Sequence, residues 1–210
     1  PAELRKIPEI MQRVDLVRQF RLNSTKEATR KQADTPTLFT EIRQPTKNYI
    51  VIPKVSSENR RYIPLGFLSP EIICNNTIKF VPDATLFHFG VLSSNVHNAW
   101  MRAVAGRLKS DYQYSNTIVY NNFPWPTPTD EQRAKIEQTA QAILDARSLY
   151  PDCSLADLYD EATMPPELRK AHQQNDKAVM QAYGFWGKLN TESACVAELM
   201  KMYQKLTERV

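Results

Sequence analysis

The seven-residue segment KSDYQYS, which begins at Lys109, alternates polar and aromatic side chains. Lys109, Asp111 and Gln113 occupy every second position, and Tyr112 and Tyr114 fill the gaps. Successive side chains of an extended chain point to opposite sides, so one edge would present an amine, a carboxylate and an amide while two rings are buried behind it. In the DNA major groove, lysine donates to guanine, aspartate accepts from cytosine N4, and glutamine pairs with adenine. The spacing therefore predicts that Lys109 and Asp111 address one G·C pair; the alternative is the solvated end of a helix.

A second polar group lies in the loop SSENRR, residues 56–61. Arg60 and Arg61 could clamp phosphates there while Ser57 or its neighbour Ser56 donates a hydrogen bond. An ordinary solvated turn accounts for the same residues equally well. Near the N-terminus a basic helical face has the same two interpretations, and a charged exposed helix is favoured for it; its members are Arg18, Arg21, Lys26, Arg30 and Lys31.

The chain offers little for catalysis. It contains no glycine-rich phosphate loop, HExxH or GxSxG motif, and its 3 Cys and 3 His are scattered rather than clustered as a zinc site requires. His88 and His97 lie near Ser93 and Ser94 but lack an acid partner, and the serines are predicted helix caps. In NNFPWP, no proline directly follows an asparagine, unlike the Asn-Pro-Pro-aromatic motif of amino-methylating DNA methyltransferases. We expect binding rather than catalysis.

Short strands and helices are predicted to position these residues. Strand patterns cover residues 38–42, 49–55, 62–67, 72–75, 77–81 and 85–89, with prolines that favour edge strands and bends. A helix over 2–20 is interrupted by Pro8 and followed by a short helix to about 33. A helix over 95–108 leads directly into KSDYQYS, and 117–120 resembles a further strand.

Helices dominate the remainder. Thr129 or Asp130 caps a long helix to about 150, a short turn of helix covers 154–159, Pro165–Pro166 begins another, and Thr191 caps a last one to about 209. Phe123 and Trp125 are predicted to pack the strand-rich part onto these helices. The predicted fold class is α+β: a mixed module of short strands with a DNA-reading helix and loop, followed by a C-terminal helical bundle.

Charge is distributed unevenly. Residues 1–128 hold 17 Lys and Arg against 10 Asp and Glu, a net of +7, whereas residues 129–210 hold 10 against 13, a net of −3. This asymmetry places polyanion binding in the first part. The sequence has no signal peptide and no apolar run of about 20 residues, so we expect a soluble, untargeted protein with reduced cysteines. It begins with proline rather than methionine, and we expect a fragment of a longer chain.

The string HFGVLSSNVHNAWMRAVAGRLKSDYQYSNTIVYNNFPWP resembles the C-terminal target-recognition region of MmeI-like type IIG (IIL) restriction–modification enzymes. The resemblance extends through RLNSTKEATRKQADTPTLFTEIRQP, VIPKVSSENRRYIPLGFLS and EQTAQAILDARSLYPDCSLADLYDEATMPPELRKAH, and covers essentially the whole chain. It implies a parent polypeptide with a nuclease domain, a helical spacer and an S-adenosylmethionine-dependent adenine methyltransferase. S-adenosylmethionine, and Mg²⁺ if a nuclease is present, would then belong to the parent, with no cofactor in this fragment.

The resemblance also implies roles for individual residues. In the family, a segment of the form GRLxSxYxYS selects bases, and its variable positions here are Lys109, Asp111 and Gln113. A further position upstream acts with the last of these, and we place it at Thr77. The family reads C at one site position when the first two residues are Glu and Arg. The opposite charge order found here therefore implies G on the strand that is read.

Residues 1–127 are accordingly predicted to be a DNA target-recognition domain and 128–210 a helical C-terminal domain. Lys109, Asp111, Gln113 and Thr77 would read bases, and the DNA backbone would be held by Arg60, Arg61, Arg107 and Ser57. The expected partners are double-stranded DNA and the N-terminal methyltransferase domain of the same polypeptide, in the cytoplasm of a prokaryote and without a membrane. The alternative is a protein-interaction or scaffold module of a phage-defence complex, with only secondary DNA contacts.

Overall fold

The computed structural model describes residues 2–208 and divides into two compact units, the first ending at Gln44 and the second beginning at Pro45. The class is α+β: two small antiparallel sheets of three strands each lie in the N-terminal part, and a helical region follows. The predicted fold class is confirmed.

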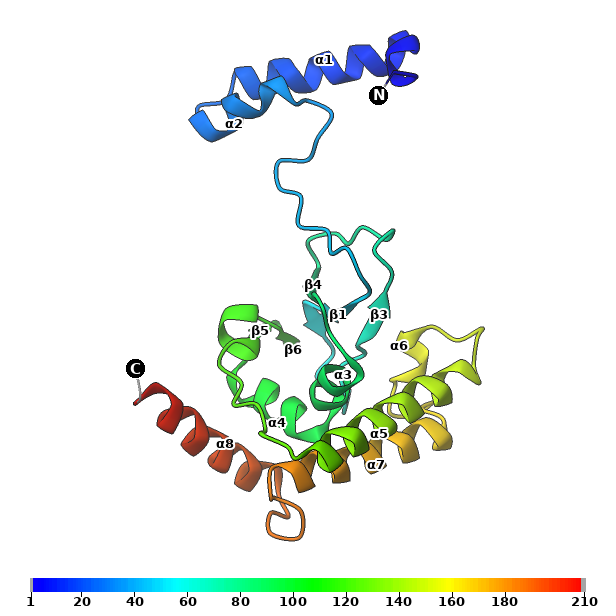
Figure 1. The fold of residues 1–210 in the computed structure, drawn as a ribbon, viewed down its shortest axis with the longest axis vertical. Helices are drawn as coiled ribbons and strands as arrows, with labels where there is room; N and C mark the ends of the chain where they lie inside the picture. Colours follow the sequence, from blue (N-terminus) through cyan, green and yellow to red (C-terminus); the bar gives the residue numbers. More distant parts are fainter. Residues whose placement is uncertain (1, 209–210) are drawn as a thin grey trace. The chain divides into compact units, whose positions relative to one another are not determined.

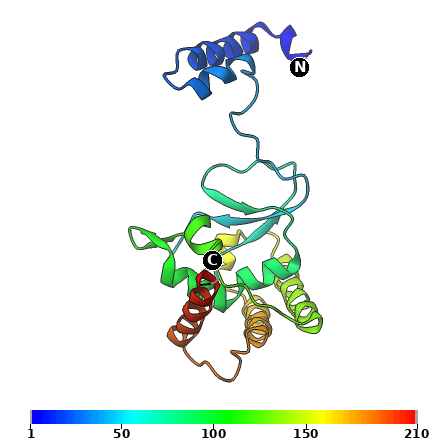
Figure 2. The same cartoon turned by 60° about the vertical axis from the view of Figure 1, so that its left-hand side comes forward.

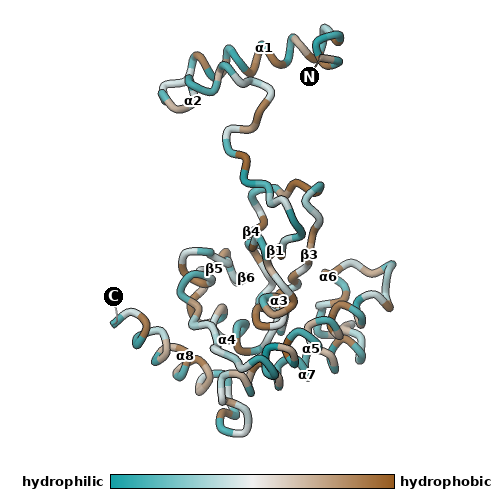
Figure 3. The backbone as a smooth tube through the Cα atoms, in the orientation of Figure 1, coloured by the Kyte–Doolittle hydropathy of each residue, from teal (hydrophilic) through white to brown (hydrophobic). Residues whose placement is uncertain are grey.

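The first unit is helical. Its elements are η1 (Leu4–Lys6), α1 (Pro8–Leu22), α2 (Glu27–Lys31) and η2 (Gln32–Asp34). Pro8 is the first residue of α1, the position at which proline's missing N–H costs nothing, so the predicted interruption is confirmed. Figure 3 shows hydrophobic residues along α1, and both Leu16 and Phe20 are exposed there. Within the described part of this unit, only Ala33 is a buried hydrophobic residue.

Two of the basic residues in this unit bind its own backbone. The Arg21 guanidinium donates to three main-chain carbonyls at 2.7–2.8 Å, those of Gln32, Thr35 and Leu38, and Arg30 donates to the carbonyls of Ser24 and Thr25. The Arg21 contacts hold the chain that follows α2, and the Arg30 contacts hold the turn between α1 and α2. The strand predicted over 38–42 is wrong, because this segment has no strand neighbour to pair with.

One continuous stretch of chain, residues 49–56, supplies a strand to each of the two sheets of the second unit. In the first sheet β1 (Tyr49–Pro53) lies between β3 (Gly66–Leu68) and β4 (Ile78–Val81), and in the second β6 (Asp111–Gln113) lies between β2 (Val55–Ser56) and β5 (Gly106–Leu108). Only Lys54 separates β1 from β2. Its backbone N–H donates to the Thr77 carbonyl at 2.8 Å, and its carbonyl accepts from the Tyr114 N–H at 2.7 Å. Lys54 therefore joins the two sheets.

The helices of the second unit are α3 (Leu86–Ser93), α4 (Asn95–Val104), α5 (Asp130–Ser148), α6 (Leu155–Leu158), α7 (Pro166–Ala182) and α8 (Glu192–Thr207). Figures 1 and 2 show α5 and α7 side by side. Helix α3 packs on α5, and α8 packs on α4. The predicted caps Ser94, Thr129 and Thr191 each accept a hydrogen bond from a backbone N–H in the first turn, and Ser154 does the same before α6. These bonds satisfy donors that the helix itself leaves unpaired.

The aromatic residues of NNFPWP join the strand-rich part to the helices, as predicted. The ring of Phe123 lies 5.5 Å from that of Trp125 and 6.4 Å from that of Tyr183, centroid to centroid. The Tyr183 hydroxyl donates to the Pro124 carbonyl at 2.8 Å. Rings at these separations pack favourably edge to face.

Several predicted strands are wrong. Residues 72–75 form none, and within 62–67 only the end pairs, in β3. Residues 85–89 begin α3, whose N-terminus is held by the Thr85 N–H donating to His88 Nδ1 at 3.1 Å. Residues 117–120 lie in a π-helix, η3 (Asn116–Tyr120), in which the Asn121 N–H reaches the Asn116 carbonyl. Helix α4 also ends earlier than predicted, at Val104, because the chain then enters β5.

A buried polar cluster lies among α5, α7 and the loop before β3. The amide of Asn175 donates to the Gly90 carbonyl at 2.7 Å and accepts from the Thr139 hydroxyl at 3.1 Å. The guanidinium of Arg147 donates to the Leu65 carbonyl at 2.6 Å. A side chain at Gly90 would lie 2.7 Å from the Ile136 side chain, so glycine permits this close approach of α3 and α5.

Asp176 is the carboxylate of this cluster. It accepts hydrogen bonds from the Tyr62 hydroxyl and from the Asn95 backbone N–H, each at 2.7 Å. Burial raises the pKa of Asp176 to about 6, against the opposing effects of those hydrogen bonds and of the Arg61 and Arg102 charges. The cluster fastens the loop that contains Arg60 and Arg61 to α4 and α7.

Candidate nucleic-acid interface

The segment predicted to read bases is a β-hairpin. Leu108 pairs with Asp111, so only Lys109 and Ser110 form the loop, and Figure 2 shows the hairpin projecting from its unit. The φ angle of Lys109 is 57°. Two-residue hairpin loops require a positive φ, which glycine adopts most easily. A lysine at this position is therefore strained, and its side chain lies at the tip of the hairpin.

The predicted alternation holds along β6. Tyr112 and Tyr114 are buried, 8% and 3% exposed, whereas Asp111 and Gln113 are partly exposed. Directly paired residues of antiparallel strands share a face, so Leu108 lies on the same face as Asp111 and Gln113. We call this the front face and the side of Tyr112 the back face. Lys109 departs from the prediction, because it lies in the loop and not on the strand.

The polar groups at the tip and on the front face are largely free of internal partners. Within residues 2–208, the side chains of Lys109 and Gln113 make no hydrogen bond or ion pair with another residue. The carboxylate of Asp111 accepts one hydrogen bond, 3.3 Å from the Glu58 backbone nitrogen. Leu108, 53% exposed, adds an apolar group beside them. An amine, a carboxylate and an amide are thus available to an external partner.

A neutral pair fixes the base of the hairpin. The Tyr114 hydroxyl lies 3.0 Å from His97 Nε2, and both groups are buried. Burial lowers the pKa of His97 to about 3 and raises the pKa of Tyr114. Neither group changes charge near neutral pH, so the position of the hairpin does not depend on their ionisation.

Thr77 is exposed just before β4. Its backbone N–H donates to Asn75 Oδ1 at 2.9 Å, and its hydroxyl donates to the same oxygen. The Thr77 carbonyl and the Tyr114 N–H both bond to the backbone of Lys54. The structure therefore brings Thr77 to the end of the hairpin that contains Gln113.

Arg107 lies on the back face, because it pairs with Tyr112. Its guanidinium lies 3.8 Å from the centroid of the Tyr112 ring, donates to the Ser110 carbonyl at 2.7 Å, and lies 3.8 Å from the Glu58 carboxylate. The structure thus separates Arg107 from Asp111 and Gln113 and gives it contacts that brace the hairpin loop.

The SSENRR loop forms a compact turn. The Ser57 hydroxyl accepts from the Asn59 N–H at 3.3 Å, and the Ser57 carbonyl accepts from the Arg60 N–H at 3.2 Å. No hydrogen bond or ion pair joins the Arg60 side chain to another described residue. The Arg61 guanidinium lies 5.6 Å from the centroid of the Tyr62 ring, and the interaction with Tyr62 is the largest of the effects that raise its pKa.

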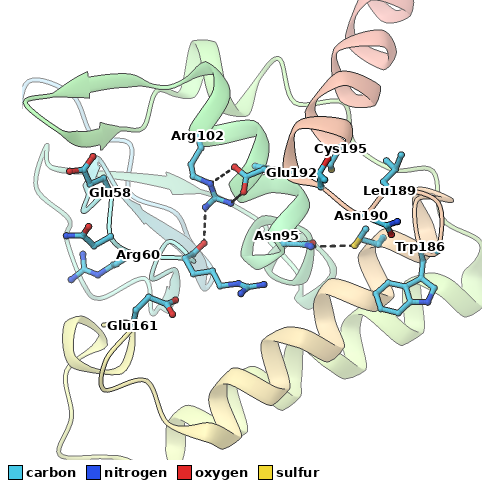
Figure 4. Close-up of a pocket in the computed structure, with 16 residues that line it drawn as sticks. Glu58, Arg60, Asn95, Arg102, Glu161, Trp186, Leu189, Asn190, Glu192 and Cys195 are labelled. Atoms are coloured by element: carbon cyan, nitrogen blue, oxygen red, sulfur yellow. Dashed lines mark hydrogen bonds and ion pairs between the residues drawn. The ribbon is translucent and has the colours of Figure 1, made fainter.

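A cleft of about 780 Å³ begins at this turn and was not foreseen from the sequence. Figure 4 shows Glu58 and Arg60 on the side of the hairpin and Trp186, from the α7–α8 loop, on the opposite side, with Arg102 and Glu192 between them. In the sequence, the glycines of GFWG indicate a tight loop at the far wall of the cleft. Gly184 and Gly187 have φ angles of 70° and 76° there. Nothing local indicated that this loop faces residues 58–61.

No group of three or more His, Cys, Asp or Glu side chains is placed to hold a metal ion among residues 2–208. In the same range, no helix has the length and apolar character needed to cross a membrane.

Two family models match the chain in tandem. Residues 1–127 match the target recognition domain of MmeI, and residues 128–210 match the C-terminal domain of MmeI. The DNA methyltransferase A of Bacillus subtilis (strain 168) is 39% identical over 207 residues, which are 99% of this chain and 23% of that protein.

A solved structure agrees with these matches. The type IIL restriction–modification enzyme MmeI, determined in complex with DNA, superposes with a TM-score of 0.90 at 50% identity, over 99% of this chain and 28% of that one. The chain thus spans about a quarter of the length of both relatives. It belongs to the MmeI family of restriction–modification enzymes and corresponds to the target recognition domain and the C-terminal domain of that family.

Proposed function

We propose that this chain recognises a specific DNA sequence as the specificity region of a type IIL restriction–modification methyltransferase. One observation supports this above the others. The hairpin presents an amine, a carboxylate and an amide from Lys109, Asp111 and Gln113, and the described structure uses almost none of their hydrogen-bonding capacity. Exposed polar groups held on a rigid strand suit recognition of base edges.

In this proposal Lys109 donates to guanine O6 and N7 while Asp111 accepts from N4 of the paired cytosine. Lys109 extends from the loop and Asp111 from the first residue of β6, so the two groups are adjacent at the tip. Gln113 lies deeper on the front face and acts with Thr77, which shares the Lys54 backbone connection. Each good contact contributes about 1–3 kcal/mol of discrimination.

The DNA backbone is held by Arg60, Arg61 and Ser57 in the SSENRR turn. The Glu58 N–H to Asp111 hydrogen bond joins this turn to the hairpin, so the proposed phosphate contacts would lie next to the proposed base contacts. Arg107 retains 46% side-chain exposure despite its three internal contacts, so it remains a proposed phosphate contact as well as a brace.

The whole protein, in this proposal, is an adenine-specific DNA methyltransferase of the prokaryotic cytoplasm. Residues 1–127 form its recognition domain and 128–210 its helical C-terminal domain. Its methyltransferase domain, on the same polypeptide, would bind S-adenosylmethionine and flip an adenine out of the duplex; a nuclease domain, if present, would use Mg²⁺. This chain itself performs no catalysis.

The test is a charge exchange in the intact protein, Lys109→Glu together with Asp111→Arg. Glutamate accepts from cytosine N4 and arginine donates to guanine, so the exchange should replace G by C at one position of the methylated sequence. Sequencing of modified bases in DNA methylated by each protein gives the answer directly.

The matched control exchanges an exposed ion pair far along the chain, Lys201→Glu together with Glu198→Lys, which face each other on α8. Net charge is preserved in both variants. The control should methylate the original sequence. If the hairpin variant is active and also methylates the original sequence, the assignment of Lys109 and Asp111 is wrong.

A further inference from the structure

Three arginines and three carboxylates line the cleft beside the hairpin, but the carboxylates are already paired, each with an arginine. Glu58 lies 3.8 Å from Arg107, Glu161 lies 3.0 Å from Arg169, and Glu192 is bound by both arms of Arg102 at 2.7 and 2.8 Å. These pairs leave two guanidinium groups of the lining, those of Arg60 and Arg61, without a carboxylate partner at ion-pair distance among the described residues.

Two carboxylates offset part of the Arg61 charge, the buried Asp176 and Glu161. Arg60 makes no ion pair or side-chain hydrogen bond with another described residue. Arg61 is exposed and Arg60 partly exposed, so both remain accessible from solvent. An open cleft in which arginines remain in excess over carboxylates favours an anionic occupant.

The far wall of the cleft adds an aromatic surface, Trp186, with a cation beside it. Trp186 is 49% exposed, and the Lys177 ammonium lies 5.3 Å from the centroid of its ring. Figure 4 places Trp186 on the opposite side of the cleft from Arg60. Cations at both ends and an exposed ring match a ligand in which negative charges repeat along an apolar framework, as phosphates and deoxyriboses do in a DNA strand.

We propose that this cleft is a groove for the DNA backbone, which leads from the base-reading hairpin across Arg60 and Arg61 onto the α7–α8 loop. Successive phosphates contact the two arginines, and Trp186 packs against a deoxyribose further along the same strand. The C-terminal domain is then part of the DNA-binding surface, not only a support. This inference rests on the proposed function, because it needs DNA at the hairpin.

The test measures how the affinity of the intact protein for DNA depends on salt. Each phosphate contact that is lost should reduce the slope of log affinity against log salt by about 0.9. Arg60→Ala with Arg61→Ala should therefore reduce the slope by about 2 and weaken binding equally for target and unrelated DNA. The control Lys170→Ala with Lys205→Ala removes the same charge from exposed positions outside the cleft and should change the slope by much less.

Variants of Trp186 test whether the DNA backbone follows the whole cleft or contacts only Arg60 and Arg61. Trp186→Ala should weaken binding about 5-fold to both DNAs, and Trp186→Phe should restore most of it, because burial of part of an aromatic face against the apolar face of a sugar contributes on this order. DNA should also quench a component of the tryptophan fluorescence that is absent from Trp186→Phe, because the comparison of the two proteins removes the signals of buried Trp100 and partly buried Trp125.

Two outcomes would overturn the groove. If the arginine variant and the lysine control have equal slopes, the cleft does not hold the backbone. If Trp186→Ala binds as the wild type does, the C-terminal domain does not line the path of the DNA. Neither outcome decides base selection, which the methylated sequence of the hairpin exchange tests separately. Equal slopes would also remove the phosphate contacts proposed above for Arg60 and Arg61.

Discussion

The hairpin and the buried cluster on α5 and α7 use the same three kinds of side chain in opposite ways. The hairpin presents Lys109, Asp111 and Gln113 to solvent with one internal hydrogen bond among them. The cluster contains Arg147, Asp176 and Asn175, a cation, a carboxylate and an amide that are bonded to groups of the protein. When the partner of a buried polar group is removed, the folded protein loses stability, because the group is left without a hydrogen bond. An exposed group forms a hydrogen bond with water instead.

This difference predicts where stability and specificity reside. Changes in the cluster should lower the free energy of unfolding and leave base selection intact. Changes in the hairpin should do the reverse. Three substitutions test the contrast in order of decreasing effect.

The largest effect is expected at Asn175, which is fully buried. Asn175→Ala removes the side-chain donor to the Gly90 carbonyl and leaves a gap in the core, so the free energy of unfolding should fall by about 2–4 kcal/mol. Urea denaturation measures it. Gln174→Ala, exposed on the same helix, and Gln113→Ala in the hairpin should each stay within about 0.5 kcal/mol. Equal losses at Asn175 and Gln113 would contradict the contrast.

An intermediate effect, which depends on pH, is expected at Asp176. Its folded pKa is raised to about 6, so its stabilising contribution is complete below its unfolded pKa, near 4, and is lost as pH rises through 6. Relative to Asp176→Asn, the wild type should lose about 1–3 kcal/mol between pH 4 and pH 7 and little beyond. Denaturation of both proteins across this range measures the difference. If the free energies of unfolding of the two proteins change with pH in the same way, burial does not raise the pKa of Asp176.

The smallest effect on stability is expected at Lys109. Its φ of 57° is unfavourable for a residue with a side chain, so Lys109→Gly should raise the free energy of unfolding by up to about 1 kcal/mol. The same variant should methylate sites with the wrong base at the predicted G·C position. Ser110→Gly, at the other loop position, where φ is not positive, should not stabilise. A Lys109→Gly protein with unchanged selectivity would remove Lys109 from base reading.

Features that depend on neighbouring residues could be predicted from the sequence. The alternation around Tyr112 and the caps at Thr129 and Thr191 were predicted correctly, because periodicity and capping involve only a few adjacent residues. The apolar run LFHFGVLS was assigned in part to a strand although it forms α3. A short run that is apolar on every side fits a buried strand and a buried helix equally.

Features that depend on strand register or on residues far apart in the sequence could not be predicted. The back-face position of Arg107 follows from a two-residue loop at Lys109–Ser110, and this dipeptide is not one of the usual hairpin signals. The cleft needs Arg60, Arg102 and Trp186 to meet from three separate parts of the chain. No local pattern contains that information.

The backbone of Lys54 has a consequence for the evolution of new specificities. Because the Thr77 carbonyl and the Tyr114 N–H both bond to this one residue, the backbone at Thr77 and the backbone next to Gln113 are coupled, and in the proposed function the two side chains would shift together along the DNA. We therefore expect the identities of these two residues to be inherited and exchanged as a pair, as those of Lys109 and Asp111 should be. A combinatorial library that varies the two pairs as units would sample functional specificities far more densely than one that varies the four positions singly.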